Sequence, residues 1–221
     1  YILQSYSKYD TSQNIANGDF SLQIKNIAQF ANNNLQDLDL LVTNITANEN
    51  LEISGKMTNT ENKIDFNDIK IVSKIVSGKA GYILNKDNID ELNIHIDFLD
   101  FVALTKNNQN LLQKSHDKIK FGHKDTNINF AADEIKLADD KINNFVSISK
   151  FKNNILDFEK IQGKYLSGGN FDIKGVVEQN QYRSQFNGVA NLNHQNSNKI
   201  LEYLNLDRLT AIDKKKNYPL K

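Results

Sequence analysis

Apolar and polar residues alternate along most of this 221-residue chain, and no other feature restricts its fold as much. Phe20, Leu22 and Ile24 are separated by single polar residues, and similar runs recur as far as Ile173. Side chains of a β-strand point in turn to the two faces of a sheet, so each run predicts a strand with one apolar and one polar face. We count about ten such strands, bounded by Asn, Asp, Lys and Gly residues that are typical of turns.

Little of the sequence has the period of a helix. Residues 98–103 predict one short helical turn, and Ser197 is a suitable N-cap for a second helix over residues 197–209. Because the strands follow one another so closely, there is no room for the crossover helices of a parallel sheet. We therefore expect a mostly β fold: a curved, twisted antiparallel sheet that forms an open groove or trough, with one or two short helices.

The composition indicates a thin or one-sided core. Residues counted as hydrophobic make up 39% of the chain, whereas about 45–50% is usual for a soluble globular domain on a slightly different residue set. The 27 basic and 27 acidic side chains cancel, and Arg183 and Arg208 are the only arginines. Nucleic-acid binding needs clustered basic residues, so the sequence predicts no nucleic-acid partner. The chain has no cysteine, which excludes disulfides, thiolate zinc sites and a cysteine nucleophile.

The histidines do not form a metal-binding pattern. His116 and His123 are seven positions apart, which places them on opposite faces of a regular strand, and we interpret both as solvated turn residues. His95 alternates with Ile94 and Ile96, so it is expected on the polar face. The sequence therefore predicts no metal site.

Other catalytic and cofactor signatures are also missing. Residues 87–91 are oxygen-rich but lack the Gly and Glu spacing of a calcium loop, so they predict an ordinary acidic turn. Gly168 and Gly169 lead into a strand, whereas a phosphate cradle leads into a helix. The pair Asp97 and Asp100 has no aromatic sugar platform nearby and indicates a solvated charged surface. We expect no enzyme activity and no cofactor.

Two parts of the chain are similar to each other. The motif Asp-Phe-x-x-Ile at Asp65–Ile69 recurs at Asp157–Ile161, and a Ser-Gly pair follows each copy, at Ser77 and at Ser167. We interpret each motif as a strand start and each Ser-Gly pair as a turn. Within one unit, 1–221, this predicts a possible internal duplication of residues 51–104 and 128–206.

The chain begins with Tyr1 instead of Met and contains no run of about 18 apolar residues. We expect it to be a fragment of a larger protein, with any membrane anchor outside the fragment.

Residues 128–175 resemble the AsmA-like superfamily of bacterial envelope proteins, whose relatives include TamB. The resemblance is clearest at residues 154–161 and 165–175, where an Asp/Asn-started strand is followed by a Ser-Gly-Gly turn and a strand that ends in Gly175. A weaker likeness covers residues 51–84, and residues 198–206 look like the Leu-rich helix that often follows in that family.

This resemblance implies a trough anchored in the inner membrane and reaching across the periplasm, with phospholipid acyl chains as its partners. The protein would take part in lipid transport to, and assembly of, the outer membrane, and its envelope protein partners are not specified. We expect the following residues to line the groove: Ile64, Phe66, Ile69, Ile71, Ile94, Ile96, Phe98, Ile128, Phe130, Val146, Ile148, Phe158, Phe171 and Ile173.

The alternation allows a second interpretation. The inner faces of a closed β-sandwich produce the same Ile and Phe pattern. The residues alone favour this sandwich, which would make the chain a structural or interaction module of a cell-envelope protein with no lipid ligand, whereas the resemblance favours the open groove.

Overall fold

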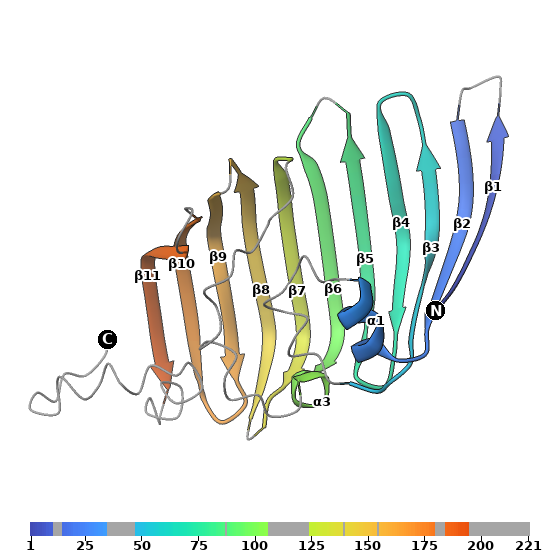
Figure 1. The fold of residues 1–221 in the computed structure, drawn as a ribbon. Coiled ribbons are helices and arrows are strands. Elements are labelled where there is room, and N and C mark those ends of the chain that lie inside the picture. Colours follow the sequence, from blue (N-terminus) through green and yellow to red (C-terminus); the bar gives the residue numbers. More distant parts are fainter. Residues whose placement is uncertain are drawn as a thin grey trace, which may run out of the picture.

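The computed structural model describes residues 1–10, 15–34, 47–86, 88–105, 124–138, 140–153, 155–179 and 184–194. In these ranges the chain forms eleven strands and two short helices, and all the strands belong to one sheet (Figure 1). The strands are β1 Ile2–Asp10, β2 Ile15–Ile24, β3 Leu51–Asn59, β4 Lys63–Val72, β5 Val76–Asn85, β6 Asp90–Asp100, β7 Thr126–Lys136, β8 Lys141–Lys152, β9 Ile155–Tyr165, β10 Gly169–Gln179 and β11 Ser184–His194. The helices are α1 Ile27–Asn34 and α3 Phe101–Thr105. The expected mostly β fold is confirmed.

The strands lie in the sheet in the order of the sequence, from β1 at one edge to β11 at the other (Figure 1). Every neighbouring pair is antiparallel except β6 and β7, which are parallel. A wholly antiparallel sheet was therefore the wrong prediction at this one pair. Residues 101–125, which include α3, connect these two strands and provide the dozen or more residues that a parallel connection needs. His116, His123 and the helix expected over 197–209 lie outside the described residues.

The described strands form a single layer. The backbone of each strand lies against its neighbours in the sheet and makes no more than marginal contact with any other strand. The order of strands is linear, so the sheet is open at β1 and β11. Within the described ranges there is no second sheet, and the sandwich architecture is not found there.

The register divides the side chains between two faces. Directly opposite residues of neighbouring strands lie on the same face, and Ile94 is opposite both Ala80 and Phe130. We call the side of the sheet that carries Ile94 and Phe130 the apolar face. The opposite side, which carries Lys79 and His95, is the polar face.

Bulges interrupt five strands and keep most of the apolar residues on one side. Each bulge places two consecutive residues on the polar face, so the flanking apolar residues are three positions apart instead of two. The doubled residues are Asn67–Asp68 in β4, Asp97–Phe98 in β6, Asp133–Glu134 in β7, Asn143–Asn144 in β8 and Glu159–Lys160 in β9. The bulges of β6, β7 and β8 lie at matching positions in these neighbouring strands. At the same level, β5 and β9 each have one residue opposite the two residues of the bulge.

Helix α3 lies at one end of the strands, and α1 lies towards the same end, in front of the strands in this view (Figure 1). Asn26 begins α1 because its Oδ1 accepts a hydrogen bond from the Gln29 backbone N–H at 2.8 Å. Ile27 of α1 is buried in a cluster with Ala47 and Ile75, and Ala103 and Leu104 of α3 pack against it. Helix α3 lies where the sequence predicted a helical turn. No helix was predicted at α1.

A second core cluster lies at the centre of the apolar face. Ile96, Ala132 and Ile135 are buried there. Ala132 and Ile135 are three positions apart in β7, and both reach this cluster because the bulge at Asp133 and Glu134 separates them.

Candidate ligand-binding face

The apolar face brings together most of the residues that were predicted to line a groove. These are Ile64, Phe66, Ile69 and Ile71 on β4, Ile94 and Ile96 on β6, Ile128 and Phe130 on β7, Phe158 on β9, and Phe171 and Ile173 on β10. The bulge at Asn67 and Asp68 explains why the apolar positions of β4 are even up to Phe66 and odd from Ile69.

Three of the predicted lining residues lie on the polar face instead. Phe98 is opposite Ser77 and Glu134, because the bulge in β6 turns it away from the face of Ile96. Val146 is opposite Ala131, and Ile148 is opposite Asn129. The prediction that these three side chains share a face with Ile94 was wrong. An alternation of apolar residues does not say which face of the sheet they occupy.

The apolar face also has members that were not among the predicted groove-lining residues. They include Phe20, Leu22, Ile53, Met57, Tyr82, Leu84, Leu92, Leu99, Ile135, Ile142, Phe145, Ile161 and Tyr165. Several belong to the apolar-x-x-apolar spacing of a bulge, such as Ile142 with Phe145. That spacing, with Asn, Asp, Glu or Lys in the middle, is the signal that could have found them.

Aromatic rings connect strands across the apolar face. The ring centroids of Phe130 and Phe145 are 5.6 Å apart, those of Phe145 and Phe171 are 6.2 Å apart, and those of Tyr165 and Phe171 are 5.6 Å apart. Such distances are typical of favourable aromatic pairs. Phe171 also lies directly over Gly163, where an added Cβ would be 2.7 Å from its Cζ. A glycine at this position leaves room for the ring.

A similar contact occurs near the other edge of the sheet. Phe20 and Phe66 meet at 6.0 Å although β3 lies between their strands. They meet over Gly55, whose missing side chain makes space for Phe20. Aromatic and aliphatic side chains thus follow one another across the face from β2 to β10.

Most of these side chains are only partly buried. Ile96 and Phe171 are buried, with 5% and 9% of their surface exposed, whereas Ile64, Phe66, Ile94 and the other predicted members of the face keep part of their surface accessible. A packed strip at the centre is therefore flanked by accessible apolar side chains. This arrangement can bind an apolar ligand by contact area alone.

One buried carboxylate lies at the start of β6. Asp90 is 2% exposed and accepts hydrogen bonds from Lys124 Nζ at 2.8 Å and from the Asn85 backbone N–H at 2.9 Å. Burial, the Asp90 charge and a hydrogen bond to Asp90 together raise the pKa of Tyr82. The interpretation of residues 87–91 as an ordinary acidic turn was wrong for Asp90, which forms a structural ion pair. Asp87 lies outside the described residues.

The polar face contains a shallow depression of about 440 Å³. Its lining includes Val146 and Ile148 together with Lys79, His95 and Asn129. These two apolar residues, expected in a groove, are thus among polar neighbours on the other side of the sheet.

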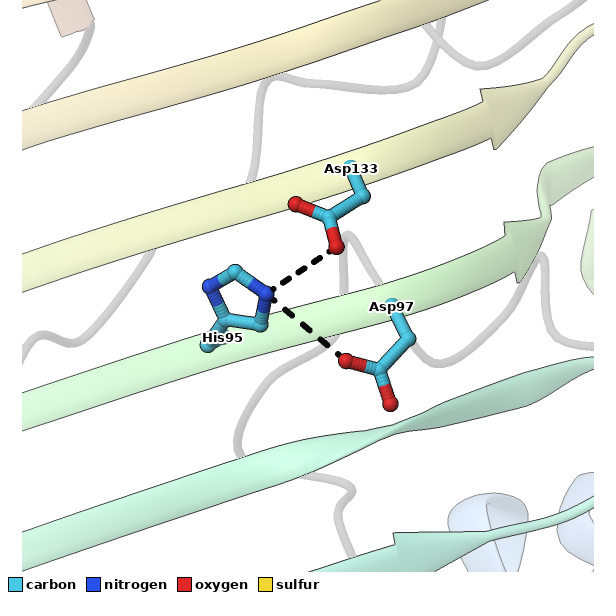
Figure 2. A group of neighbouring side chains, drawn as sticks. All are labelled: His95, Asp97 and Asp133. Atoms are coloured by element: carbon cyan, nitrogen blue, oxygen red, sulfur yellow. Dashed lines mark hydrogen bonds and ion pairs between the residues drawn. The ribbon is translucent and has the colours of Figure 1, made fainter.

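His95 is one of the residues that line this depression, and it contacts two carboxylates (Figure 2). Its Nε2 is 3.2 Å from Asp133 Oδ2 and 3.7 Å from Asp97 Oδ1, and the three possible ligand atoms lie within 4.8 Å of one another. Among the described residues, His95, Asp97 and Asp133 form the group whose side chains lie close enough to bind one metal ion together. All three side chains are more than half exposed, so we interpret the contacts as surface hydrogen bonds and ion pairs. The position of His95 on the polar face agrees with the prediction.

Asp97 and Asp100 do not act as a pair. Asp97 contacts His95, whereas Asp100 accepts a hydrogen bond from Lys136 Nζ at 2.7 Å and another from the Ala103 backbone N–H at 2.8 Å. Asp100 is therefore the N-cap of α3, and this carboxylate has a structural role.

No protein-family model matches this sequence, and no curated protein and no solved structure is significantly similar to it. Neither of the described helices has the length and apolar character needed to cross a membrane. The fold and the site define a protein with a single-layered open sheet and one apolar face.

Proposed function

We propose that the apolar face binds the acyl chains of phospholipids and that the protein acts without enzymatic chemistry or a cofactor. The observation that carries this proposal is the single layer: the eleven strands place most of their large apolar side chains on one side, and no second sheet covers that side among the described residues. Apolar surface left without a second layer indicates an interaction site.

The energetics favour long apolar chains as ligands. Transfer of each CH₂ group from water to an apolar surface stabilises the complex by about 0.8 kcal/mol. Ile64, Phe66 and Ile94 offer accessible surface for such contacts. Binding to this face would depend on the apolar contact area, and few polar groups would fix the position of the ligand. An acyl chain could therefore bind at many positions along the face.

The resemblance to the AsmA-like superfamily extends this proposal to the cell envelope. Under this extended proposal, a segment outside the given sequence anchors the protein to the inner membrane, and the sheet lies in the periplasm. The apolar face then carries phospholipid during the assembly of the outer membrane. If no lipid binds in the following experiment, the result favours a purely structural role in the envelope.

The experiment compares two isoleucines on opposite faces. Native mass spectrometry of the chain mixed with palmitoyl-oleoyl phosphatidylethanolamine should show bound lipid. Ile94→Asp places a charge on the apolar face and should reduce the bound fraction at least about tenfold, because an unpaired carboxylate on an apolar surface loses its hydration. Ile148→Asp, on the polar face of β8, should bind lipid like the unsubstituted chain.

Circular dichroism must show that both variants are folded. Ile64→Asp, at a site nearer the end of β4, provides a second test if Ile94→Asp does not fold. Ile96→Asp is unsuitable, because Ile96 is buried and a carboxylate there should unfold the protein. The proposal is wrong if the unsubstituted chain binds no lipid or if Ile148→Asp removes binding as strongly as the apolar-face variants.

A further inference from the structure

Strand β11 is an edge of the sheet, and no other described element covers its outer side. It is 11 residues long and has no Lys, Arg, Asp, Glu or Pro. Edge strands normally carry such residues, since a long uncharged edge offers its free backbone N–H and C=O groups to any other strand. Among the described residues, β10 is the only strand that pairs with β11.

Val189 is an unusual residue for its position. It lies opposite Lys174 on the polar face, and 62% of its surface is exposed. Val189 is the central residue of this edge strand, where a strand paired with β11 would cover its side chain.

Residues at equal distances before and after Val189 in β11 are similar in size and polarity. Gly188 corresponds to Ala190, Asn187 to Asn191, and Phe186 to Leu192. Two identical strands that pair antiparallel about a two-fold axis at Val189 place these residues directly opposite one another. In this pairing a small residue lies opposite a small residue, an asparagine lies opposite an asparagine, and a large apolar residue lies opposite a large apolar residue.

We propose that a second copy of this chain pairs with β11 in antiparallel register about Val189, forming a symmetric dimer. The two Val189 side chains meet on the polar face, and Phe186, which is 46% exposed, lies opposite Leu192 of the second copy on the apolar face. No like charges oppose each other, because the strand has no lysine, arginine or carboxylate. The interface uses one patch on both copies, as closed two-fold dimers do.

The other edge of the sheet fits this role less well. Strand β1 carries Lys8 and Asp10. Antiparallel self-pairing about its central Tyr6 would place Asp10 opposite Ile2 of the second copy. The charge pattern therefore favours β11 as the self-complementary edge.

The proposed pairing preserves the two faces of the sheet. A two-fold axis perpendicular to the sheet leaves the apolar faces of both copies on the same side, so they join into one surface. The pairing itself depends only on β11 and does not require that the apolar face binds lipid.

A single introduced cysteine tests the register, because the chain has none of its own. In Val189→Cys the two thiols face each other across the axis with a Cα separation of about 4.5–5.5 Å, and this is within the range of about 4.4–6.8 Å for a disulfide. Mild oxidation should convert most of this variant into a disulfide-linked dimer on a non-reducing gel. Asn191→Cys, on the same strand and face, places its thiols about 14 Å apart and should stay monomeric on the same gel.

Val72→Cys controls for random collision, because Val72 is an exposed valine of the polar face in an interior strand. Sedimentation of the unsubstituted chain should show a monomer–dimer equilibrium. Val189→Lys, which opposes two ammonium groups, should raise the dimer dissociation constant at least about tenfold. The proposal is overturned if the unsubstituted chain is monomeric at all concentrations, if it forms assemblies larger than a dimer, or if Asn191→Cys cross-links as readily as Val189→Cys.

Discussion

At the scale of single residues, Asp100 shows how one carboxylate connects separate elements. It ends β6, caps α3 through the Ala103 backbone N–H, and pairs with Lys136 of β7. Burial raises the pKa of Asp100, but the hydrogen bonds from Lys136, Ala103 and Val102 outweigh it and lower the pKa overall. Protonation of this group therefore opposes folding.

This shift predicts how stability depends on pH. A lowered pKa in the folded state contributes stability above the unfolded value of about 3.9, and the contribution is lost as the pH falls through the folded pKa. We expect Asp100→Asn, which can still cap the helix, to reduce the free energy of unfolding at pH 7 by about 1 kcal/mol. Urea unfolding from pH 7 to pH 2 should show this difference shrinking below about pH 5.

Asp68→Asn is the matched control. Asp68 pairs with Lys56, but both side chains are more than 60% exposed, so its substitution should change the free energy of unfolding by less than about 0.5 kcal/mol. A difference between Asp100→Asn and the unsubstituted chain that stays constant down to pH 2 would contradict the assigned role of Asp100.

The burial of Asp90 was beyond prediction from the sequence. Its acidic neighbours indicate a turn, and its partner Lys124 is distant in the chain. Burial of a charge becomes favourable only when a partner and hydrogen bonds compensate for lost hydration. Here the fold brings β6 beside β7, and this supplies the partner.

At the scale of elements, the bulges decide which side chains share a face. The alternation of the sequence correctly predicted the strands that contain Ile64, Ile94, Ile128 and Phe171. It could not predict the face of Phe98, because a bulge reverses the phase of the residues that follow it. The direction of β7 was equally inaccessible, since no local pattern fixes the relative direction of two strands joined by a long connection.

Helix α1 was missed for a related reason. Its apolar residues Ile27 and Phe30 precede an Asn-rich end, and that composition indicates a loop. The helix begins at the Asn26 cap and packs Ile27 against Ala47 and Ile75, which come from distant parts of the chain. Tertiary contacts therefore stabilise a segment with weak intrinsic helix propensity.

The bulge in β8 has a backbone conformation that can be tested. Asn144 has a φ angle of 52°, in the left-handed region that Asn and Gly tolerate and β-branched residues do not. We expect Asn144→Val to lower the free energy of unfolding by about 1–3 kcal/mol and Asn144→Gly to leave it nearly unchanged. Urea unfolding of both variants measures the two values.

Asn143→Val provides the comparison within the same bulge. Asn143 also lies on the polar face, but its φ angle is not positive, so valine should cost less there than at Asn144. Equal destabilisation at both positions would show that side-chain contacts matter at this bulge and that the backbone conformation does not.

At the scale of the whole molecule, each strand depends on its neighbours in the sheet. Backbone contacts between strands are almost all between adjacent strands, and one of the two buried clusters lies on β6 and β7. The outer strand β1 exposes Ile2, Leu3 and Tyr6 by 48%, 63% and 70%. Local opening should therefore become easier from the centre towards this edge.

Hydrogen exchange followed by mass spectrometry can measure this gradient. Backbone amides of β6 and β7 should exchange slowest, and those of β1 should exchange at least about a hundredfold faster, because fewer buried contacts oppose their opening. Uniform protection across the described strands would contradict the gradient and would indicate that the sheet opens as one cooperative unit.

The number of strands sets the capacity of the apolar face. Eleven strands about 4.8 Å apart extend over about 50 Å, and a strand of 11 residues is about 36 Å long. One leaflet of a membrane has a hydrocarbon thickness of only about 15 Å. If the proposed function is correct, one acyl chain fills a small part of this face, and several phospholipids can lie on a single protein at the same time.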